Sequence, residues 1–358
     1  MALLLFPALP VARTADIEPS KSLPPAPTTG FWPPAPDAPR VQFLTTISSV
    51  TDITGKPVPA GQDAVFPRPY GIRIANGCVY VCSAVSGQVL VLDLARKEVR
   101  QIAEATGLNF QKPIDIAVAA DGVKYVADAG RNFVLAFDQN DKYVGRLGVK
   151  GMRPVALAVN AKQVFVADNA ASMIRVFDRK TGEQVRTIDG PHTDPGRFGG
   201  PVGLAIDPRG ATFVTDLTCQ LQKFSADGTL DWVVGGPGDK RAVFTRPRHI
   251  ACDPDGNLYV VDSALATVQL VDKDGNLIMH FGGQGQHPGS MDVPGGIALS
   301  DDPKDVALFG RFVHPAFDPK RLVIISNTLG DAKLNVYAFG QLKPGKTFAD
   351  LKTLTPAP

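Results

Sequence analysis

Short apolar stretches recur along this chain in one fixed order. Each copy begins with a Pro and a few mainly apolar residues, continues with an aromatic-Val-x-Asp step or a close variant, and ends in an alternating stretch that closes on Phe-Asp or similar. Apolar and alternating stretches of this length predict β-strands separated by turns. The Pro residues that open the copies are Pro69, Pro113, Pro154, Pro201, Pro247 and Pro294.

The spacing of these anchor prolines predicts the fold. Successive anchors are 44, 41, 47, 46 and 47 residues apart. A period of that size, made of short strands, is typical of a β-propeller in which each repeat is one blade. Fourth strands follow turns at Thr181-Gly182, Asp227-Gly228 and Asp274-Gly275, because these residues tolerate positive φ. We therefore predict an all-β, six-bladed β-propeller.

The last repeat is incomplete and predicts how the ring closes. It ends at a third strand near Phe339, and no fourth strand follows. Residues 41–50 (VQFLTTISSV) read as a strand that has no partner in its own part of the chain. We expect this strand to be the outer strand of the last blade, so that closure hides the exposed sheet edges. The propeller then covers residues 41–340.

The two ends of the chain have their own composition. Residues 1–18 begin with an apolar stretch, MALLLFPALPVA, that is too short to span a bilayer and resembles the end of a secretory signal that lacks its basic start. Residues 19–40 are Pro-rich and predict an extended linker, in which Phe31 and Trp32 have the aromatic character to dock on the folded part. Residues 341–358 predict a flexible basic tail. We expect an exported protein, periplasmic or at the cell surface, without a transmembrane span.

Charge and cysteine spacing exclude several classes of function. The formal net charge is +2 with 20% charged residues, which gives no basis for a nucleic-acid partner. The four cysteines form no Cys-x-x-Cys pair and no haem-attachment motif, so we expect no covalent haem, no cysteine-based zinc site and no other cofactor. Buried free thiols are the default for them, although a disulfide of Cys78 with Cys219 or another partner stays open.

The aspartates that end the recurrent step have two interpretations. Asp128, Asp168, Asp216 and Asp262 occupy the same position in separate blades, where Ser83 and Asn327 stand in the first and last blades. Four related carboxylates are compatible with a metal site. They also lie at strand ends, where Asp side chains accept hydrogen bonds from the amides of the following turn. We favour the structural role and expect no metal.

One position of the innermost strands carries candidate chemistry. The residues two after each anchor proline line the axial channel: Gly71, Asp115, Ala156, Gly203, His249 and Gly296. Blades two and five are opposite in a six-fold ring, so Asp115 and His249 are predicted to face each other, with Arg248 beside His249. A His with a carboxylate is suited to acid–base catalysis. A water-bridged polar pair at a channel mouth is the structural alternative, and we favour it.

The last repeat also contains a long insertion, residues 301–320, between its first two strands. A long loop within a compact domain is usually functional. Its aromatic and basic residues are candidates for partner contact: Phe309, Arg311, Phe312, His314 and Phe317. Val306, Phe309 and Val313 fit one face of a short helix. The alternative is a lid that packs its aromatics on its own blade.

The repeats resemble the NHL repeat. The clearest copy is PRHIACDPDGNLYVVDSALATVQLVDKDGNLIMHFGG, residues 247–283, and the connecting stretches GGPGDKRAVFTRP and GGQGQHPGSMDVP are similar to NHL blade-to-blade loops. The leader FWPPAPDAPRVQFL and the end of the last blade look like those of exported bacterial NHL proteins found with multihaem c-type cytochromes.

The resemblance implies a function that the motifs alone do not specify. It implies a non-catalytic interaction or scaffold propeller, an accessory subunit of a multihaem cytochrome assembly for electron transfer. One alternative is a lyase or hydrolase that uses the channel pair, since amidating lyases resemble this fold. Those enzymes hold zinc with several channel histidines, whereas only His249 occupies the ring here. A small-ligand-binding module is a further alternative.

Overall fold

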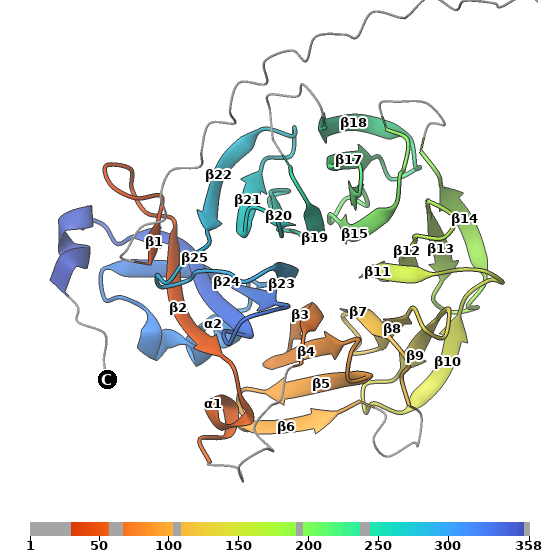
Figure 1. Ribbon diagram of the computed structural model, residues 1–358, viewed down its shortest axis with the longest axis horizontal. Coiled ribbons are helices and arrows are strands. Elements are labelled where there is room, and N and C mark those ends of the chain that lie inside the picture. Colours follow the sequence, from red (N-terminus) through yellow and green to blue (C-terminus); the bar gives the residue numbers. More distant parts are fainter. Residues whose placement is uncertain (1–29, 57–66, 103–108, 191–195, 237–243, 354–358) are drawn as a thin grey trace, which may run out of the picture.

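Six antiparallel sheets surround one axis in the computed structural model of this protein (Figure 1). The structure describes residues 30–56, 67–102, 109–190, 196–236 and 244–353. The first strand of each repeat lies nearest the axis and begins at an anchor proline, a position where a strand tolerates the missing N–H. The predicted all-β, six-bladed propeller is confirmed.

Five blades have four strands each, ordered from the axis outward as they occur in the sequence. Blade one comprises β3 (Pro69–Ala75), β4 (Cys78–Ser83), β5 (Gln88–Asp93) and β6 (Glu98–Gln101). Blade two comprises β7 (Pro113–Val118), β8 (Lys124–Asp128), β9 (Phe133–Phe137) and β10 (Tyr143–Leu147). Blade three comprises β11 (Pro154–Val159), β12 (Gln163–Asp168), β13 (Met173–Asp178) and β14 (Gln184–Ile188). Blade four comprises β15 (Pro201–Ile206), β16 (Thr212–Asp216), β17 (Gln220–Phe224) and β18 (Leu230–Gly235). Blade five comprises β19 (Pro247–Cys252), β20 (Leu258–Asp262), β21 (Thr267–Val271) and β22 (Leu277–Gly282).

Blade six joins both ends of the propeller sequence. Its strands are β23 (Pro294–Ser300), β24 (Phe317–Asn327) and β25 (Leu334–Leu342), followed outward by β2 (Val41–Ile47) and β1 (Phe31–Trp32). β2 runs antiparallel to β25, as the closing strand was predicted to do. It ends three residues earlier than predicted, because Ser49 and Asp52 form a capping box that starts the short helix α1 (Val50–Thr54).

The segments on either side of the predicted propeller also contact it. Phe31 and Trp32, which the sequence places in a linker, are buried against blade six, with the Trp32 and Tyr337 ring centroids 5.9 Å apart. At the other end, the 3-10 helix η3 (Phe348–Thr353) buries Leu351 in the same region. The predicted signal segment and residues 19–29 lie outside the described residues.

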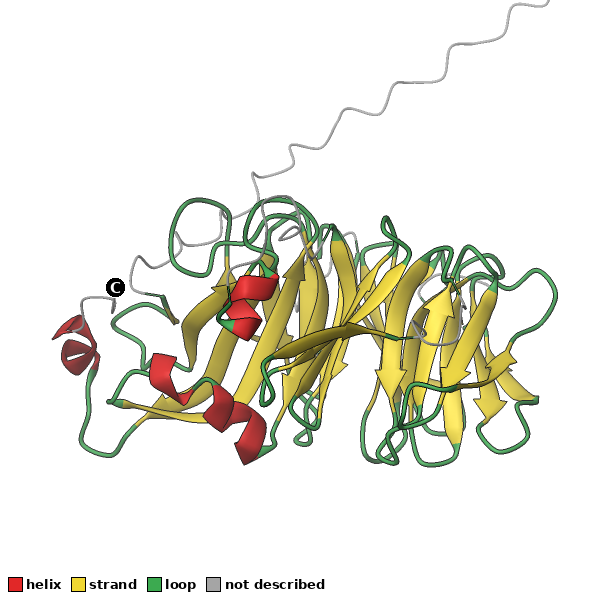
Figure 2. Ribbon diagram, turned by 90° about the horizontal axis from the view of Figure 1, so that it is seen from below, coloured by secondary structure: helices red, strands yellow, loops and turns green. Residues whose placement is uncertain are grey.

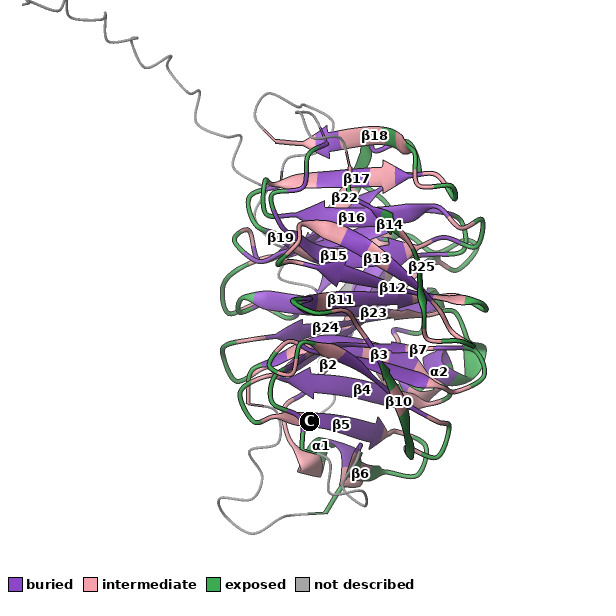
Figure 3. Ribbon diagram, turned by 90° about the vertical axis from the view of Figure 1, so that its right-hand side faces the viewer, coloured by how far each residue is buried: buried purple, intermediate pink, exposed green. Residues whose placement is uncertain are grey.

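Side chains of neighbouring blades fill the wedges between the sheets. On the innermost strands, the third residue after the anchor proline packs toward the preceding blade. In all blades but the first, the fourth packs toward the following blade. In blade five, Ile250 packs with Phe213 of blade four, and Ala251 packs with Ile297 of blade six. Figure 3 shows the result, with strands largely buried and the connecting turns exposed.

In blades two to five, the step aspartate binds the loop that enters the blade. Asp262 is fully buried, and its carboxylate accepts the backbone N–H groups of Ala264 and Leu265 in the turn that follows. It also accepts those of Thr245 and Arg246 from the loop between blades four and five. Asp128, Asp168 and Asp216 bind the corresponding two segments in their blades. The expected turn contacts are present, and the loop contacts add a second anchor.

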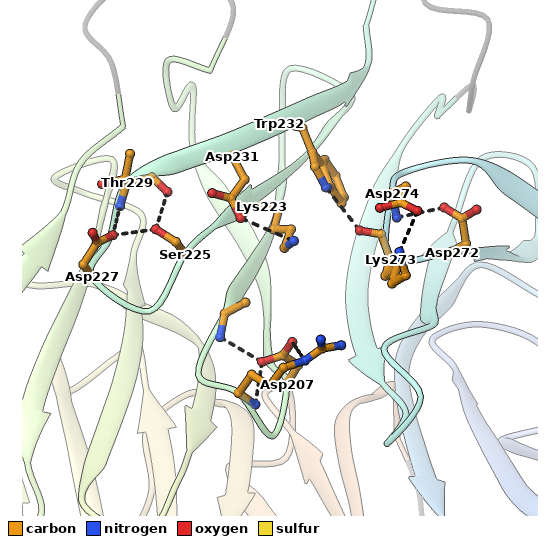
Figure 4. A network of polar contacts seen from close by, with 12 residues as sticks. Asp207, Lys223, Ser225, Asp227, Thr229, Asp231, Trp232, Asp272, Lys273 and Asp274 are labelled. Carbon is orange, nitrogen blue, oxygen red and sulfur yellow. Dashed lines mark hydrogen bonds and ion pairs between the residues drawn. The ribbon is translucent and has the colours of Figure 1, made fainter.

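The outer hairpins follow the predicted turn chemistry. Gly228 and Gly275 have φ of 98° and 90°, in the region that favours glycine. Asp227 accepts the Thr229 N–H across its turn, and Trp232 Nε1 donates to the Lys273 carbonyl at 3.2 Å (Figure 4). The last contact links the outer strand of blade four to a turn of blade five.

Glycines on the innermost strands allow the blades to approach closely around the axis. A Cβ on Gly203 would lie 2.3 Å from the Arg248 carbonyl oxygen of the next blade. A Cβ on Gly296 would lie 2.1 Å from the Tyr70 carbonyl oxygen. Both distances are impossible for a real side chain. This close packing narrows the channel at the level of the candidate channel residues.

Candidate functional site

The predicted channel pair meets on the axis. Asp115 extends from β7 and His249 from β19, and His249 Nε2 lies 3.1 Å from Asp115 Oδ2. Both side chains are fully buried. Their blades are opposite in the ring (Figure 1), so the pair bridges the channel at one depth. The geometric prediction from the repeat alignment is borne out by this distance.

The polar atoms of the pair form only some of the hydrogen bonds that they could form. Asp115 Oδ2 accepts the Leu157 backbone N–H at 2.8 Å. Asp115 Oδ1 and His249 Nδ1 have no hydrogen-bond partner among the described residues, and the approach of His249 Nε2 to the carboxylate is close without being an aligned hydrogen bond. A base that receives a proton from a substrate must be within hydrogen-bond reach of it. With no exposed surface, the pair is better suited to closing the channel.

A recess of about 400 Å³ lies at one mouth of the channel and is lined by residues from all six blades. Arg248 lines this recess, where its Nε is 3.4 Å from Ser263 Oγ. Tyr70 lies beside it. Burial raises the pKa of Tyr70, and the neighbouring Arg248 guanidinium opposes part of that rise. Arg248 thus belongs to the recess rather than to the Asp115–His249 pair.

A smaller recess of about 150 Å³ occupies the opposite part of the channel and contains an arginine that the sequence reasoning missed. The residues four after the anchor prolines are alanine in five blades, and the sixth is Arg73. Arg73 lines this recess, and its Nε has no hydrogen-bond partner among the described residues. Comparing this position across the six repeats would have found it, because one charge interrupts a ring of small residues.

The blade-six insertion packs mainly inward. It forms α2 (Pro303–Leu308) and η2 (Gly310–Phe312), and it buries Phe309, His314 and Phe317 against blades six and one. These three candidate contact residues are therefore not available at the surface. Arg311 is exposed and Phe312 half-buried. The helix predicted from Val306, Phe309 and Val313 exists, but it ends before the latter two.

Hydrogen bonds to blade one and to β2 hold the insertion against the propeller. Asp305, which is buried, accepts the backbone N–H of Gly77 in blade one at 2.9 Å and the Ser300 hydroxyl at 2.6 Å. Gln42 on β2 donates to the Phe312 carbonyl and accepts the His314 N–H. The insertion thus ties the closing strand and blade one to blade six. Figure 2 shows the helices gathered on this side of the ring.

A groove of about 630 Å³ remains beside the insertion. It lies between the end of β2, α1, the turn between β5 and β6, and the exposed part of the insertion. Its lining residues include Thr45, Thr46, Ile47, Lys97, Arg311 and Phe312. Successive residues of β2 line it, which indicates that the groove runs along the edge of this strand.

Metal and thiol chemistry add little to these sites. In the part of the chain that the structure describes, no three His, Cys, Asp or Glu side chains are grouped so as to hold a metal ion. All four cysteines are free thiols. Burial raises the pKa of Cys82 well above its usual range and that of Cys252 to about 12. Within the same described residues, no helix is long and apolar enough to cross a bilayer.

The fold and the repeated strand pattern define a six-bladed β-propeller. No family model matches the chain. It is similar to NHL repeat-containing protein 3 from Mus musculus, with 25% identity over 187 residues that cover 47% of this chain and 53% of the relative. The corresponding Homo sapiens protein is 23% identical over the same share. The matched region spans about half the length of these curated relatives.

Solved structures of similar fold include enzymes. Virginiamycin B lyase from Staphylococcus aureus superposes with a TM-score of 0.54 at 10% identity, covering 84% of this chain and 99% of the lyase. A catalytically inactive His-to-Ala variant of that lyase with quinupristin gives 0.53 at 11% identity, covering 76% and 95%. A protein of unknown function from Bacteroides thetaiotaomicron gives 0.59 at 19% identity, covering 84% and 75%. At these identities the likeness shows the fold alone.

Proposed function

We propose that the protein is a non-catalytic interaction propeller that holds a partner protein at the groove beside the blade-six insertion. The observation that carries this proposal is the edge of β2. Beyond the two residues that pair with β1, no strand of the described residues lies on the outer side of β2. Proteins usually cover or disrupt such an edge, because its unpaired N–H and C=O groups can bind another chain.

The groove offers both backbone and side-chain contacts. An extended partner segment that lies along Thr45, Thr46 and Ile47 would add a strand to blade six and gain main-chain hydrogen bonds. Arg311 and Phe312 would supply specificity, since the Arg311 guanidinium lies 4.5 Å from the centre of the Phe312 ring at the groove wall. Arg and aromatic residues are the types that most often dominate binding energy at interfaces.

Charge favours an acidic partner segment. Arg311 and Lys97 line the groove, and neither forms an ion pair with a carboxylate of the described residues. The one carboxylate in the lining, that of Asp52, is occupied by the capping box of α1. We propose a multihaem c-type cytochrome as the partner and an exported location, periplasmic or at the cell surface. The leader and the end of blade six, which resemble those of cytochrome-associated NHL proteins, support this choice.

Binding of a purified multihaem c-type cytochrome to the immobilised full chain tests the proposal. We expect Arg311→Glu to weaken binding by at least about tenfold, because it removes a cation–acid contact and adds a repulsive charge. Phe312→Ala should act in the same direction. Arg209→Glu, an exposed arginine in a blade-four turn, is the matched control and should leave affinity unchanged.

This experiment tests the docking site and the identity of the partner separately. If the cytochrome does not bind but native extracts yield a partner whose capture Arg311→Glu abolishes, the scaffold function stands and the cytochrome is rejected. If Arg311→Glu and Arg209→Glu behave alike with every captured protein, the groove is not the docking site.

A channel-site lyase or hydrolase is the second candidate function, favoured by the contact between Asp115 and His249. We expect no turnover of quinupristin, the compound bound to the structurally similar lyase, because both side chains are inaccessible. Chromatography of the reaction mixture measures this. A rate that falls by about 100-fold in both Asp115→Asn and His249→Gln, but not in Arg209→Glu, would instead make the protein an enzyme.

A further inference from the structure

We propose that the recess at the mouth of the channel is a binding site for a small apolar carboxylate, a molecule with an aliphatic or aromatic body and one carboxylate group. The site shares no residue with the groove of the proposed partner, so this inference stands independently of that function. Its volume of about 400 Å³ falls in the range of small-molecule pockets.

The walls of the recess are mainly apolar. The residues that directly follow the anchor prolines meet here, and three of them are aliphatic: Ile114, Val155 and Val202. Ala84, Val85 and Leu217 extend the apolar lining outward, and the last two are 64% and 51% exposed. Large side chains exposed to this extent around a concavity are typical of a binding site. They provide the surface for the body of the ligand.

The charged lining has a single sign. Arg248 and Arg68 both line the recess, and its lining includes no Asp or Glu. Neither arginine forms an ion pair with a carboxylate among the described residues. Arg248 Nε lies 3.4 Å from Ser263 Oγ, and the Arg248 guanidinium also interacts with the Tyr70 hydroxyl. A guanidinium at a partly apolar surface gains most from a carboxylate, to which it can donate two parallel hydrogen bonds. An anionic group on the ligand would satisfy this charge.

The backbone around the arginines is arranged to hold them at the recess. Blade six has Gly295 at the position of the aliphatic residues, and a Cβ there would lie 2.9 Å from Tyr70 Cδ2. The glycine therefore makes room for the Tyr70 ring, which lies beside Arg248. Arg68 has a φ of 52°, which is uncommon for a residue other than glycine. Backbone in this region tends to cluster at functional sites.

Isothermal titration calorimetry of the full chain with 4-phenylbutyrate, indole-3-acetate and octanoate tests the site. We expect at least one of these acids to bind, and we expect 4-phenylbutyramide and acetate to bind at least about tenfold more weakly. The amide lacks the charge and acetate lacks the apolar body. Arg248→Met should weaken the acid by about 10- to 100-fold, the effect of losing a charge-assisted hydrogen bond.

Two further variants test whether the effect is specific to Arg248 and whether the apolar wall contributes to binding. Arg96→Met removes an exposed arginine outside the recess and should leave binding unchanged. Leu217→Ser tests the apolar wall without touching a charge and should weaken the acid several-fold. Melting temperatures verify that all variants are folded. The inference is overturned if none of the three acids binds at about 1 mM, if the amide binds as well as the acid, or if folded Arg248→Met binds like the wild type.

Discussion

Deleting residues 1–47 is expected to convert the protein into an aggregating species with no cooperative unfolding transition. The deletion removes β2 and leaves the outer edge of β25 unpaired along its whole length. It also removes three buried aliphatic side chains, Val41, Leu44 and Ile47, each worth about 1.5–3 kcal/mol. Such a loss is comparable to the whole stability of a typical protein. Size-exclusion chromatography with light scattering and thermal denaturation measure the effect.

Deletion of residues 1–29 is the matched control for this prediction. It leaves intact the contacts that β1 and β2 make with other described residues, and we expect the melting temperature and the monomer fraction to equal those of the full chain. If the longer deletion stays monomeric and melts within a few degrees of the shorter one, closure by β2 contributes little and the ring is held by its other blades.

Asp262→Ala is expected to lower the free energy of unfolding by about 4 kcal/mol. Four backbone N–H groups donate to this buried carboxylate at 2.7–3.2 Å, and the substitution leaves them without an acceptor in a region closed to bulk water. Removing one partner of a buried charged hydrogen bond costs more than the bond contributes, since the other partner remains desolvated. Urea denaturation followed by fluorescence gives the value.

Two further variants separate this effect from a loss of charge. Asp274→Ala removes a carboxylate that is 65% exposed, and the change should stay within about 0.5 kcal/mol. Asp262→Asn retains one acceptor oxygen and should fall between the two. A cost below about 1 kcal/mol for Asp262→Ala would mean that the loop between blades four and five holds its position without the carboxylate.

The ring was predictable because its information is repeated. Six anchor prolines and six step residues impose one strand pattern, and an incomplete last copy leaves residues 41–50 as its missing strand. The same alignment placed Asp115 opposite His249, which the 3.1 Å distance bears out. Positions related by the repeat have related places in space, so a pairwise contact across the axis followed from sequence alone.

Features that occur once were harder to predict. The insertion packs against blade one because Asp305 accepts a hydrogen bond from the Gly77 N–H. The two residues are 228 positions apart, so no local sequence pattern predicts this contact. The aromatic residues of the insertion are typical both of a surface that contacts a partner and of a lid that packs on its own blade, so composition does not distinguish the two. The Pro-rich composition around Phe31 and Trp32 indicates an extended chain, but it does not tell whether that chain contacts blade six. Arg248 is next to His249 in the sequence, and its side chain lines the recess, a place that the local sequence does not indicate.

Closure of the ring by strands from both ends of the sequence also orders the assembly of the protein during synthesis. Thr46 on β2 bonds Asn335 on β25, a separation of 289 residues, whereas each of the first five blades forms within one repeat. Contacts this distant in sequence are slow to form, because a long segment must be brought together before they gain any energy. A nascent chain can therefore complete five blades while β2 waits unpaired. β2 is synthesised before the first five blades but pairs only after β25 has been made, and until then its edge is open to other chains.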